Sequence, residues 1–220
     1  MMIRLICVAI GYVFGLFQTS YIYGKMHGID IRTQGSGNAG TTNALRVLGK
    51  KAGAITFLGD ALKCVAAVLL VQALFGASHG DIRPLLALYA GAGVILGHNF
   101  PFYLGFKGGK GIAASAGMML AFGHFPIFAV SALAFILVFT ITNYVSLGSM
   151  VLYLCFLVQV IFLGQRGEFG MSQGHLTELY IVAACLTALA FWQHRTNIGR
   201  LIHGTENKTY LLKKKTKGEN

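Results

Sequence analysis

Charged residues are scarce in this sequence. They make up 11% of its 220 residues, and only seven of them are Asp or Glu. A soluble domain carries about 25% charged residues, so too little polar surface is present to coat a water-soluble globule. Cysteine is also rare, and the four cysteines lie inside apolar runs without metal-type spacing. No His, Asp or Glu cluster has ligand spacing either, so we expect neither a metal nor a cofactor.

Long apolar runs take the place of the missing charge, and 55% of the residues are hydrophobic. The run from Val145 to Leu163 is long enough to cross a bilayer, which requires about 17–25 residues. The runs are unbroken rather than alternating, which predicts helices and not barrel strands. We therefore expect an all-α integral membrane protein, a polytopic helical bundle with seven spans, or five if the short third and fourth spans are re-entrant. The expected spans are Ile3–Tyr23, Gly53–Phe75, Leu85–Gly97, Ile112–Phe122, Pro126–Thr142, Val145–Leu163 and Glu178–Trp192.

The distribution of positive charge predicts the orientation. Of the 18 Lys and Arg residues, 14 fall in segments that an odd span count places on one side, and only Arg4, Arg83 and Arg166 fall on the other. By the positive-inside rule the N-terminus is external and the C-terminus cytoplasmic. Residues 1–206 would form a single transmembrane domain. Residues 207–220 would be a basic cytoplasmic tail, whose Lys213, Lys214, Lys215 and Lys217 lie near anionic headgroups.

The net charge of +11 is therefore carried by loops and tail. Because the positive-inside rule accounts for that placement, nucleic acid is not an expected partner.

The first of three polar clusters is the glycine-rich sequence from Gly35 to Asn43, followed by a helical-looking segment that contains Arg46. It lacks the preceding strand of a dinucleotide-binding fold and the Gly-Lys-Ser/Thr of a P-loop. Glycines nevertheless let several backbone N–H groups point at one anion, and a following helix N-terminus adds partial positive charge. A plain turn between spans is the alternative, but the density of donors favours phosphate binding. The residues expected to bind are Ser36, Gly37, Asn38, Gly40, Thr42 and Asn43.

The second cluster follows the third expected span. Lys107 and Lys110 alternate with glycines, and His98 lies where the span ends. Glycine lets the backbone approach a ligand closely, and lysine supplies a compact charge for a phosphoryl oxygen. A basic loop that merely obeys the positive-inside rule is the alternative. Ionisable groups at membrane depth favour a functional role, which includes His98.

The third cluster runs from His194 to Glu206. His194 and Asn197 share one helical face, and Arg200 lies beside Asn197. Taken alone, this segment is typical of a juxtamembrane helix whose basic residues lie at the headgroups. All three clusters fall on the same predicted side of the membrane. The positive-inside rule explains their Lys and Arg residues but not their glycine, Asn and Ser.

Two further features are weaker. Ser146 and Ser149 begin the sixth expected span on that same side and offer hydroxyl groups. Asp60 and Lys63 are three residues apart inside the second span, where an unpaired charge would be costly, so we expect them to neutralise each other. That pair could be purely structural.

The polar clusters resemble the motifs of the bacterial acyl-phosphate:glycerol-3-phosphate acyltransferases. The resemblance extends from about Gly15 to Glu206, and two positions depart from the usual pattern: Asn143 stands where Arg is usual, and Cys64 where Gly is usual. The matching motifs are Ser36-Gly37-Asn38-x-Gly40-x-Thr42-Asn43, Gly97-His98-x-x-Pro101 with Phe106-Lys107-Gly108-Gly109-Lys110-Gly111, and His194-Arg195-x-Asn197-x-x-Arg200-Leu201-x-x-Gly204-x-Glu206.

The resemblance implies transfer of a fatty acyl group from acyl phosphate to the sn-1 hydroxyl of glycerol 3-phosphate, giving lysophosphatidic acid and phosphate. It places the active site at the cytoplasmic face of the bacterial plasma membrane. The implied partners are the lipid bilayer and the soluble enzyme that makes acyl phosphate. A transporter of a phosphorylated small molecule, with the anion loops at its midplane, is the alternative.

Role assignments complete the prediction. No His is followed five positions later by Asp, the arrangement of many acyl-CoA glycerolipid acyltransferases, so the leaving phosphate or an acyl-phosphate oxygen is expected to take the hydroxyl proton. The predicted catalytic residues are His194, Asn197, Lys107 and Arg46. Substrate binding is assigned to the six residues of the first loop and to His98, Lys110, Ser146, Ser149, Arg200 and Glu206.

Overall fold

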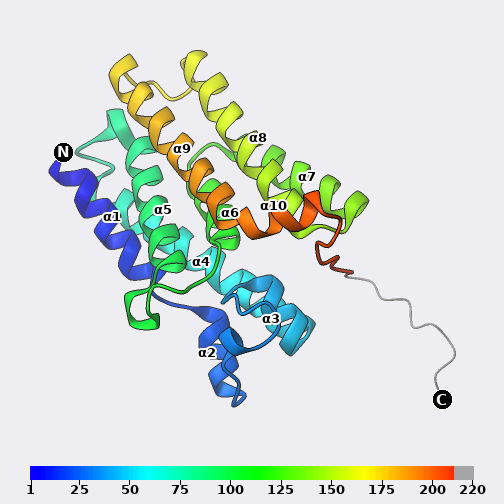
Figure 1. The fold of residues 1–220 in the computed structure, drawn as a ribbon. Coiled ribbons are helices and arrows are strands. Elements are labelled where there is room, and N and C mark those ends of the chain that lie inside the picture. The colour runs from blue at the N-terminus through cyan, green and yellow to red at the C-terminus, as the bar shows by residue number, and fades with distance from the viewer. Residues whose placement is uncertain (211–220) are drawn as a thin grey trace, which may run out of the picture.

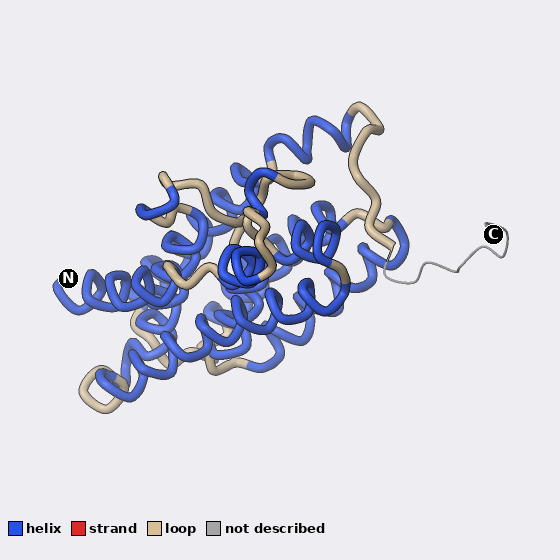
Figure 2. Tube along the Cα trace, turned by 90° about the horizontal axis from the view of Figure 1, so that it is seen from below, coloured by secondary structure: helices blue, strands red, loops and turns tan. Residues whose placement is uncertain are grey.

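The computed structural model describes residues 1–210, and within them all regular structure is helical (Figures 1 and 2). The chain therefore forms an all-α bundle, as the apolar runs predict. Its α-helices are α1 (Met2–Gly15), α2 (Thr19–Met26), α3 (Thr41–Leu48), α4 (Lys50–Phe75), α5 (Arg83–Asn99), α6 (Ile112–Ala121), α7 (Phe125–Thr142), α8 (Val145–Gln165), α9 (Gln173–Gln193) and α10 (Arg195–Ile202). Three short 3₁₀ turns lie at Ile31–Thr33, Gly80–Ile82 and Phe102–Leu104.

Within residues 1–210, six helical segments are long and apolar enough to cross a membrane, judged by length and composition. They are Met2–Met26, Lys50–Phe75, Gly80–Leu104, Phe125–Thr142, Val145–Gln165 and Gln173–Gln193. The apolar α6 has only ten residues, which is about 15 Å and half of a hydrocarbon core. The number of complete crossings and the orientation of the termini stay predictions.

Two expected spans differ from the observed helices. The third span is not short, because α5 begins at Arg83 with a proline in its first turn and runs for 17 residues. The first span is not one helix, because the chain breaks between Gly15 and Thr19. The carbonyl groups freed by this break are satisfied by side chains: Gln18 Nε2 donates to the Gly15 oxygen, and Lys63 Nζ to that of Phe17. Gln18 Nε2 also donates to the His98 oxygen of α5. Such satisfaction is what a membrane requires of a broken helix.

The helix α5 lies at the centre of the bundle. In its most apolar stretch 78% of the residues are buried, against 17% for α7, so α7 presents most of its surface outward. The close contact of α5 with α1 depends on glycine. A Cβ at Gly11 or Gly15 would collide with backbone oxygens of α5, and one at Gly93 or Gly97 with those of α1. Small residues four apart let membrane helices pack backbone against backbone.

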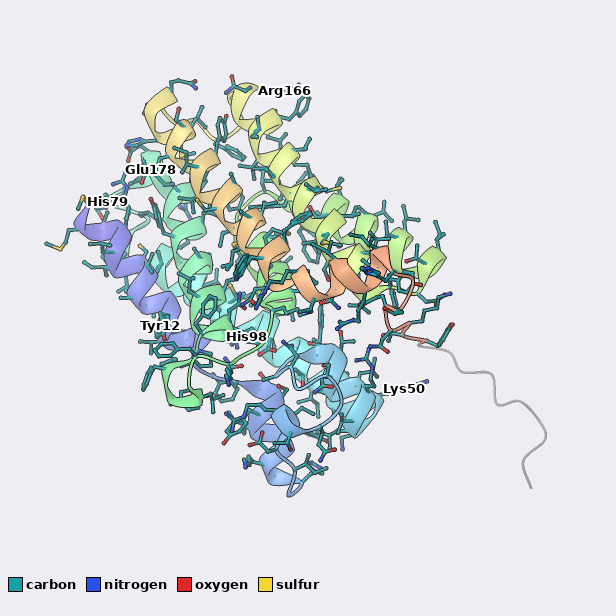
Figure 3. The ribbon with its side chains drawn as sticks, viewed as in Figure 1. Tyr12, Lys50, His79, His98, Arg166 and Glu178 are labelled. Carbon is teal, nitrogen blue, oxygen red and sulfur yellow. The ribbon has the colours of Figure 1, made fainter. Side chains whose placement is uncertain are left out.

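The two ends of the bundle carry different polar groups. His79, Arg166 and Glu178 lie at one end, and Lys50 and His98 lie toward the other (Figure 3). At the first end, Glu178 accepts hydrogen bonds from Arg4 Nη2 at 2.7 Å and from the Tyr89 hydroxyl at 2.7 Å. The second end gathers α2, α3, α10 and the loop after α5 (Figure 1). This second end holds the residues that the sequence predicts for the site.

Candidate active site

A cavity of about 1090 Å³ opens at this second end. Its wall is formed by the loop before α3, the end of α5, the loop before α6, the start of α8 and the α9–α10 region. All sixteen predicted site residues line it, although they come from five separate parts of the chain. The structure therefore brings the three sequence clusters together, together with Ser146 and Ser149. It does not by itself assign a role to any of them.

The glycine-rich loop is held in place by Asn43. The Nδ2 group of this side chain donates to the carbonyl oxygens of Ile31 and Gln34, both at 3.0 Å, and its Oδ1 accepts from the Ser36 N–H at 2.9 Å. Both amide hydrogens and the oxygen are thus engaged with backbone. Asn43 shapes the loop and has no donor left for a substrate, which differs from its predicted role. Ser36, Asn38 and Thr42 remain at the cavity wall.

The glycines of the second loop serve packing inside the protein. The Gly109 N–H donates to the His98 oxygen at 3.1 Å, and the Gly108 N–H to that of Asn99 at 3.1 Å. A Cβ at Gly109 would collide with His98 Nε2 and would lie 2.9 Å from the Ala39 oxygen. The sequence suggests that these glycines let the backbone approach a ligand. In the structure, Gly109 instead lets the lysine loop close directly over His98.

Glu206 joins three elements of the cavity wall. Its Oε1 accepts from Asn197 Nδ2 at 2.6 Å and from Ser146 Oγ at 2.8 Å, and its Oε2 accepts from Arg200 Nε at 2.7 Å. Burial alone would raise the pKa of Glu206, but the hydrogen bonds from Asn197, Arg200 and Ser146 outweigh it and hold that pKa below its usual value. The carboxylate is therefore charged at neutral pH and holds α8 and α10 together.

Lys110 and His194 lie at the centre of the charged part of the wall. Lys110 donates to Asn197 Oδ1. Burial lowers the pKa of Lys110 to about 8; Glu206 raises it, and Arg200, Arg195 and Arg46 lower it further. The Nδ1–H of His194 donates to the Ala190 oxygen at 2.7 Å, so Nε2 retains its lone pair. Burial, and then the Lys110 charge, lower the pKa of His194 to about 4, which keeps this imidazole neutral at pH 7.

The residues just after Glu206 cross the cavity rather than leaving the bundle. The Thr209 N–H donates to the Asn143 oxygen at 2.9 Å, and Arg46 Nη2 contacts Thr209 Oγ1 at 3.4 Å. Asn143 has a left-handed φ of +61° at the end of α7, a conformation that Asn adopts more readily than Arg does. The predicted tail thus begins as part of the cavity wall. Its four-lysine cluster lies outside the described residues.

The two predicted serines of α8 are hydrogen-bonded within the protein, whereas two predicted cations are exposed. The Ser149 hydroxyl donates to the Val145 oxygen of its own helix at 2.8 Å. Lys107 and Arg46 are exposed at the mouth of the cavity. The hydroxyl hydrogens of Ser146 and Ser149 are therefore both engaged within the protein, whereas the two exposed cations can reach an entering anion.

Sequence reasoning missed three contributors to the wall. Asp60 lines the cavity from α4, and the buried Asn99 lines it from the end of α5. An apolar part of the wall is formed by Phe57 of α4 with Phe135 and Phe139 of α7. The charged pair in an apolar span was a signal for Asp60, whereas nothing in the sequence distinguishes the three phenylalanines from lipid-facing ones.

The fold and cavity define an integral membrane protein with a cationic polar site beside an apolar wall. Residues 5–204 match the family model described as glycerol-3-phosphate acyltransferase. One relative with that name is the protein of Clostridioides difficile (strain 630), which is 49% identical over 93% of this chain and 94% of the relative. Another is the protein of Shouchella clausii (strain KSM-K16), which is 43% identical over 91% of this chain and 93% of the relative. The chain therefore belongs to the glycerol-3-phosphate acyltransferase family and is an acyltransferase of phospholipid synthesis.

Solved structures agree with this assignment. The crystal structure of PlsY (YgiH), an integral membrane glycerol 3-phosphate acyltransferase in its glycerol 3-phosphate form, matches with a TM-score of 0.79 and 32% identity over 94% of this chain and 96% of that one. Its lysophosphatidic acid form matches with a TM-score of 0.77 and 31% identity over 94% and 95%. The transporter alternative is set aside by this membership.

Proposed function

We propose that this chain transfers a fatty acyl group from acyl phosphate to the sn-1 hydroxyl of glycerol 3-phosphate, with the active site at the cytoplasmic face of the membrane. The observation that carries the proposal is the composition of one cavity wall. Arg46, Lys107, Lys110 and Arg200 line it together with Phe57, Phe135 and Phe139. An acyl phosphate has an anionic head on an apolar chain, and glycerol 3-phosphate brings a second anion.

Two phosphates that enter one cavity repel each other, so the site must supply several cations and N–H donors. The three exposed or half-buried cations come from two separate segments: Arg46 from helix α3, and Lys107 and Lys110 from the loop before α6. The first N–H groups of α3 have no partner within the helix, and they add partial positive charge beside Gly40 and Thr42. Related PlsY crystallises with glycerol 3-phosphate, which supports a phosphate role for these groups.

The acyl chain would lie along the phenylalanine wall. Phe57 is 44% exposed on α4, and α7 presents apolar residues outward along its length. This side of the cavity faces the bilayer if the span assignment holds. A chain lying there keeps its apolar surface out of water while the phosphoryl head reaches the cations.

In the reaction, the sn-1 oxygen attacks the acyl carbon, a new ester C–O bond forms, and the bond from that carbon to the phosphate oxygen breaks. The departing phosphate accumulates negative charge and takes the hydroxyl proton. Cations held in place stabilise that charge, and positioning of the two substrates supplies about 7–11 kcal/mol of barrier reduction. Neutral His194 and Asn197, at the base of the cationic wall, would hold the acceptor hydroxyl.

The orientation and the donor remain parts of this proposal. A cytoplasmic opening would let glycerol 3-phosphate enter from water and let the soluble enzyme that makes acyl phosphate deliver its product. An acyl phosphate places a phosphate at the reacting carbon, whereas a thioester such as acyl-CoA places none there. The cationic loops therefore favour acyl phosphate as donor.

The test is a donor comparison with purified protein in detergent. Lysophosphatidic acid formed from glycerol 3-phosphate is measured with palmitoyl phosphate and, in parallel, with palmitoyl-CoA. We expect product with the acyl phosphate and no more than trace product with the thioester. Equal rates with the two donors, or product from the thioester alone, would overturn the donor assignment. Lys110→Ala protein serves as the matched control for contaminating activity.

A further inference from the structure

A buried charged pair lies directly behind His98. Lys63 Nζ donates to Asp60 Oδ1 at 2.9 Å and to the Phe17 oxygen at 2.5 Å, and it lies 2.9 Å from His98 Nδ1 and 3.4 Å from the Gly15 oxygen. Asp60 Oδ1 also accepts from the Thr19 hydroxyl at 3.0 Å. The side chains of Lys63, Asp60 and His98 are 5%, 1% and 3% exposed. The three residues therefore form one chain of contacts that ends at the cavity wall.

The contacts determine where the imidazole proton lies. A lysine ammonium has three hydrogens and no lone pair, and here three short contacts account for all three. Because an ammonium can only donate, a hydrogen bond between Lys63 Nζ and His98 Nδ1 requires that nitrogen to be the acceptor. A proton on Nδ1 would point at an ammonium only 2.9 Å away, so the doubly protonated form is excluded. The single ring proton is thus on Nε2.

The Nε2–H lies beside Gly109, which lines the cavity together with His98. His98 lines the cavity, and its Nε2 lies against Gly109, where a Cβ would collide with it. Within residues 1–210 no protein group accepts a hydrogen bond from Nε2, while its partner nitrogen is engaged by Lys63. A neutral imidazole is consequently held at the cavity wall with an Nε2–H that has no described partner.

We propose that Asp60 and Lys63 are positioning residues that hold His98 as the Nε2–H tautomer, so that it donates to a phosphate oxygen of glycerol 3-phosphate. Lys63 sets the tautomer, and Asp60 holds the Lys63 side chain in place. The identity of the anion rests on the proposed function, whereas the tautomer follows from the contacts alone. The pair therefore has a task beyond neutralising itself inside a span.

The chain of contacts predicts an asymmetry between the two partners. In Asp60→Asn, Lys63 can still donate to Nδ1, so His98 keeps its tautomer. In Lys63→Met that donor is gone, and Nδ1 is free to take the proton. A pair that merely neutralised itself would be equally sensitive at both positions. Because Lys63→Met alone leaves a buried carboxylate unpaired, the double variant Asp60→Asn with Lys63→Met is the folded reference.

The experiment is ¹⁵N NMR of histidine-labelled protein in detergent, in which protonated and unprotonated ring nitrogens have distinct shifts. The His98 signals are assigned by their loss in His98→Gln. We expect Nε2–H with bare Nδ1 in the wild type and in Asp60→Asn, and a mixture of tautomers in the double variant. Adding glycerol 3-phosphate should move the His98 Nε2 signal. Nδ1–H or a doubly protonated ring in the wild type, or an unchanged tautomer in the double variant, would overturn the proposal.

Kinetics supply the second readout. Losing one fixed donor to a phosphate should raise the KM for glycerol 3-phosphate on the order of 10-fold in the double variant, with a smaller change in kcat. Asp60→Asn should retain most of the wild-type KM. Because the NMR result needs no turnover, wild-type protein with the expected tautomer but no reaction with acyl phosphate would support this inference and contradict the proposed donor.

Discussion

Replacing Glu206 by Gln keeps the shape of the side chain and removes its charge. If the amide oxygen takes the place of Oε1, it can still accept from Asn197 and Ser146. The amide nitrogen then faces Arg200 Nε, so two N–H donors oppose each other in place of the 2.7 Å ion pair between Arg200 Nε and Glu206 Oε2. The substitution therefore releases Arg200 from the wall and loosens the attachment of α10 to α8.

The size of the effect follows from that single lost contact. A hydrogen bond to a charged group contributes about 1.5–3 kcal/mol. Glu206 is 5% exposed but Arg200 is 40% exposed, so solvent screening reduces the contribution to about 1–2 kcal/mol. If that energy aligns Arg200 and Asn197 with the substrate, kcat/KM for glycerol 3-phosphate should fall about 5- to 30-fold.

The assay is the initial rate of lysophosphatidic acid formation at varied glycerol 3-phosphate, with acyl phosphate saturating. Glu168→Gln is the matched control, since it removes a carboxylate from an exposed loop at the other end of the bundle. A thermal melt in detergent shows whether the variant is folded. A folded Glu206→Gln enzyme with kcat/KM within twofold of the control would refute the role of Glu206 in holding the site together.

Three further outcomes are expected. The KM for glycerol 3-phosphate should rise as pH increases above about 8, because Lys110, whose pKa is lowered to about 8, loses its charge there. Lys110→Arg should remove this rise in KM. The same rise in the Lys110→Arg enzyme would contradict the role of Lys110 in phosphate binding. Gly109→Ala should lose nearly all activity, because its Cβ would collide with an imidazole at the cavity wall, whereas Gly174→Ala, with open space around it, should not. In a cysteine-free background, Met2→Cys should be labelled from outside intact cells and Lys208→Cys should not; labelling of both would contradict the odd span count.

Much of the architecture follows from the sequence because apolarity is a property of whole segments. The helices from α4 to α9 appear where apolar runs predict them, most of them a few residues longer than expected. The short fourth span is present as α6. The break after Gly15 escaped prediction because Leu16 and Phe17 are as apolar as any span residue. The freed carbonyls are satisfied by Gln18, which lies in the break itself, and by Lys63, which comes from the distant helix α4.

The candidate site was predictable as a set of residues but not as a set of contacts. A count of hydrogen-bond donors selects Asn43 and Asn38 equally, yet the side-chain amide of Asn43 is fully hydrogen-bonded to backbone groups of its own loop. Glycine spacing suggests a ligand at Gly109, yet a protein imidazole occupies that space. In each case the residue lines the cavity but its partner is a protein group, because partners depend on which loops the bundle brings together.

The break in the first span links membrane stability to the chemistry of the cavity. A helix that ends inside a bilayer must have its carbonyl groups satisfied, and here Gln18 and Lys63 satisfy them. Lys63 needs a counter-charge in an apolar span, which explains Asp60. Its remaining hydrogen then goes to His98. The polar groups that the membrane demands at this break are thus the same groups that orient a donor toward the substrate, so loss of Lys63 should disturb folding and binding together, whereas the neutral double variant should separate the two.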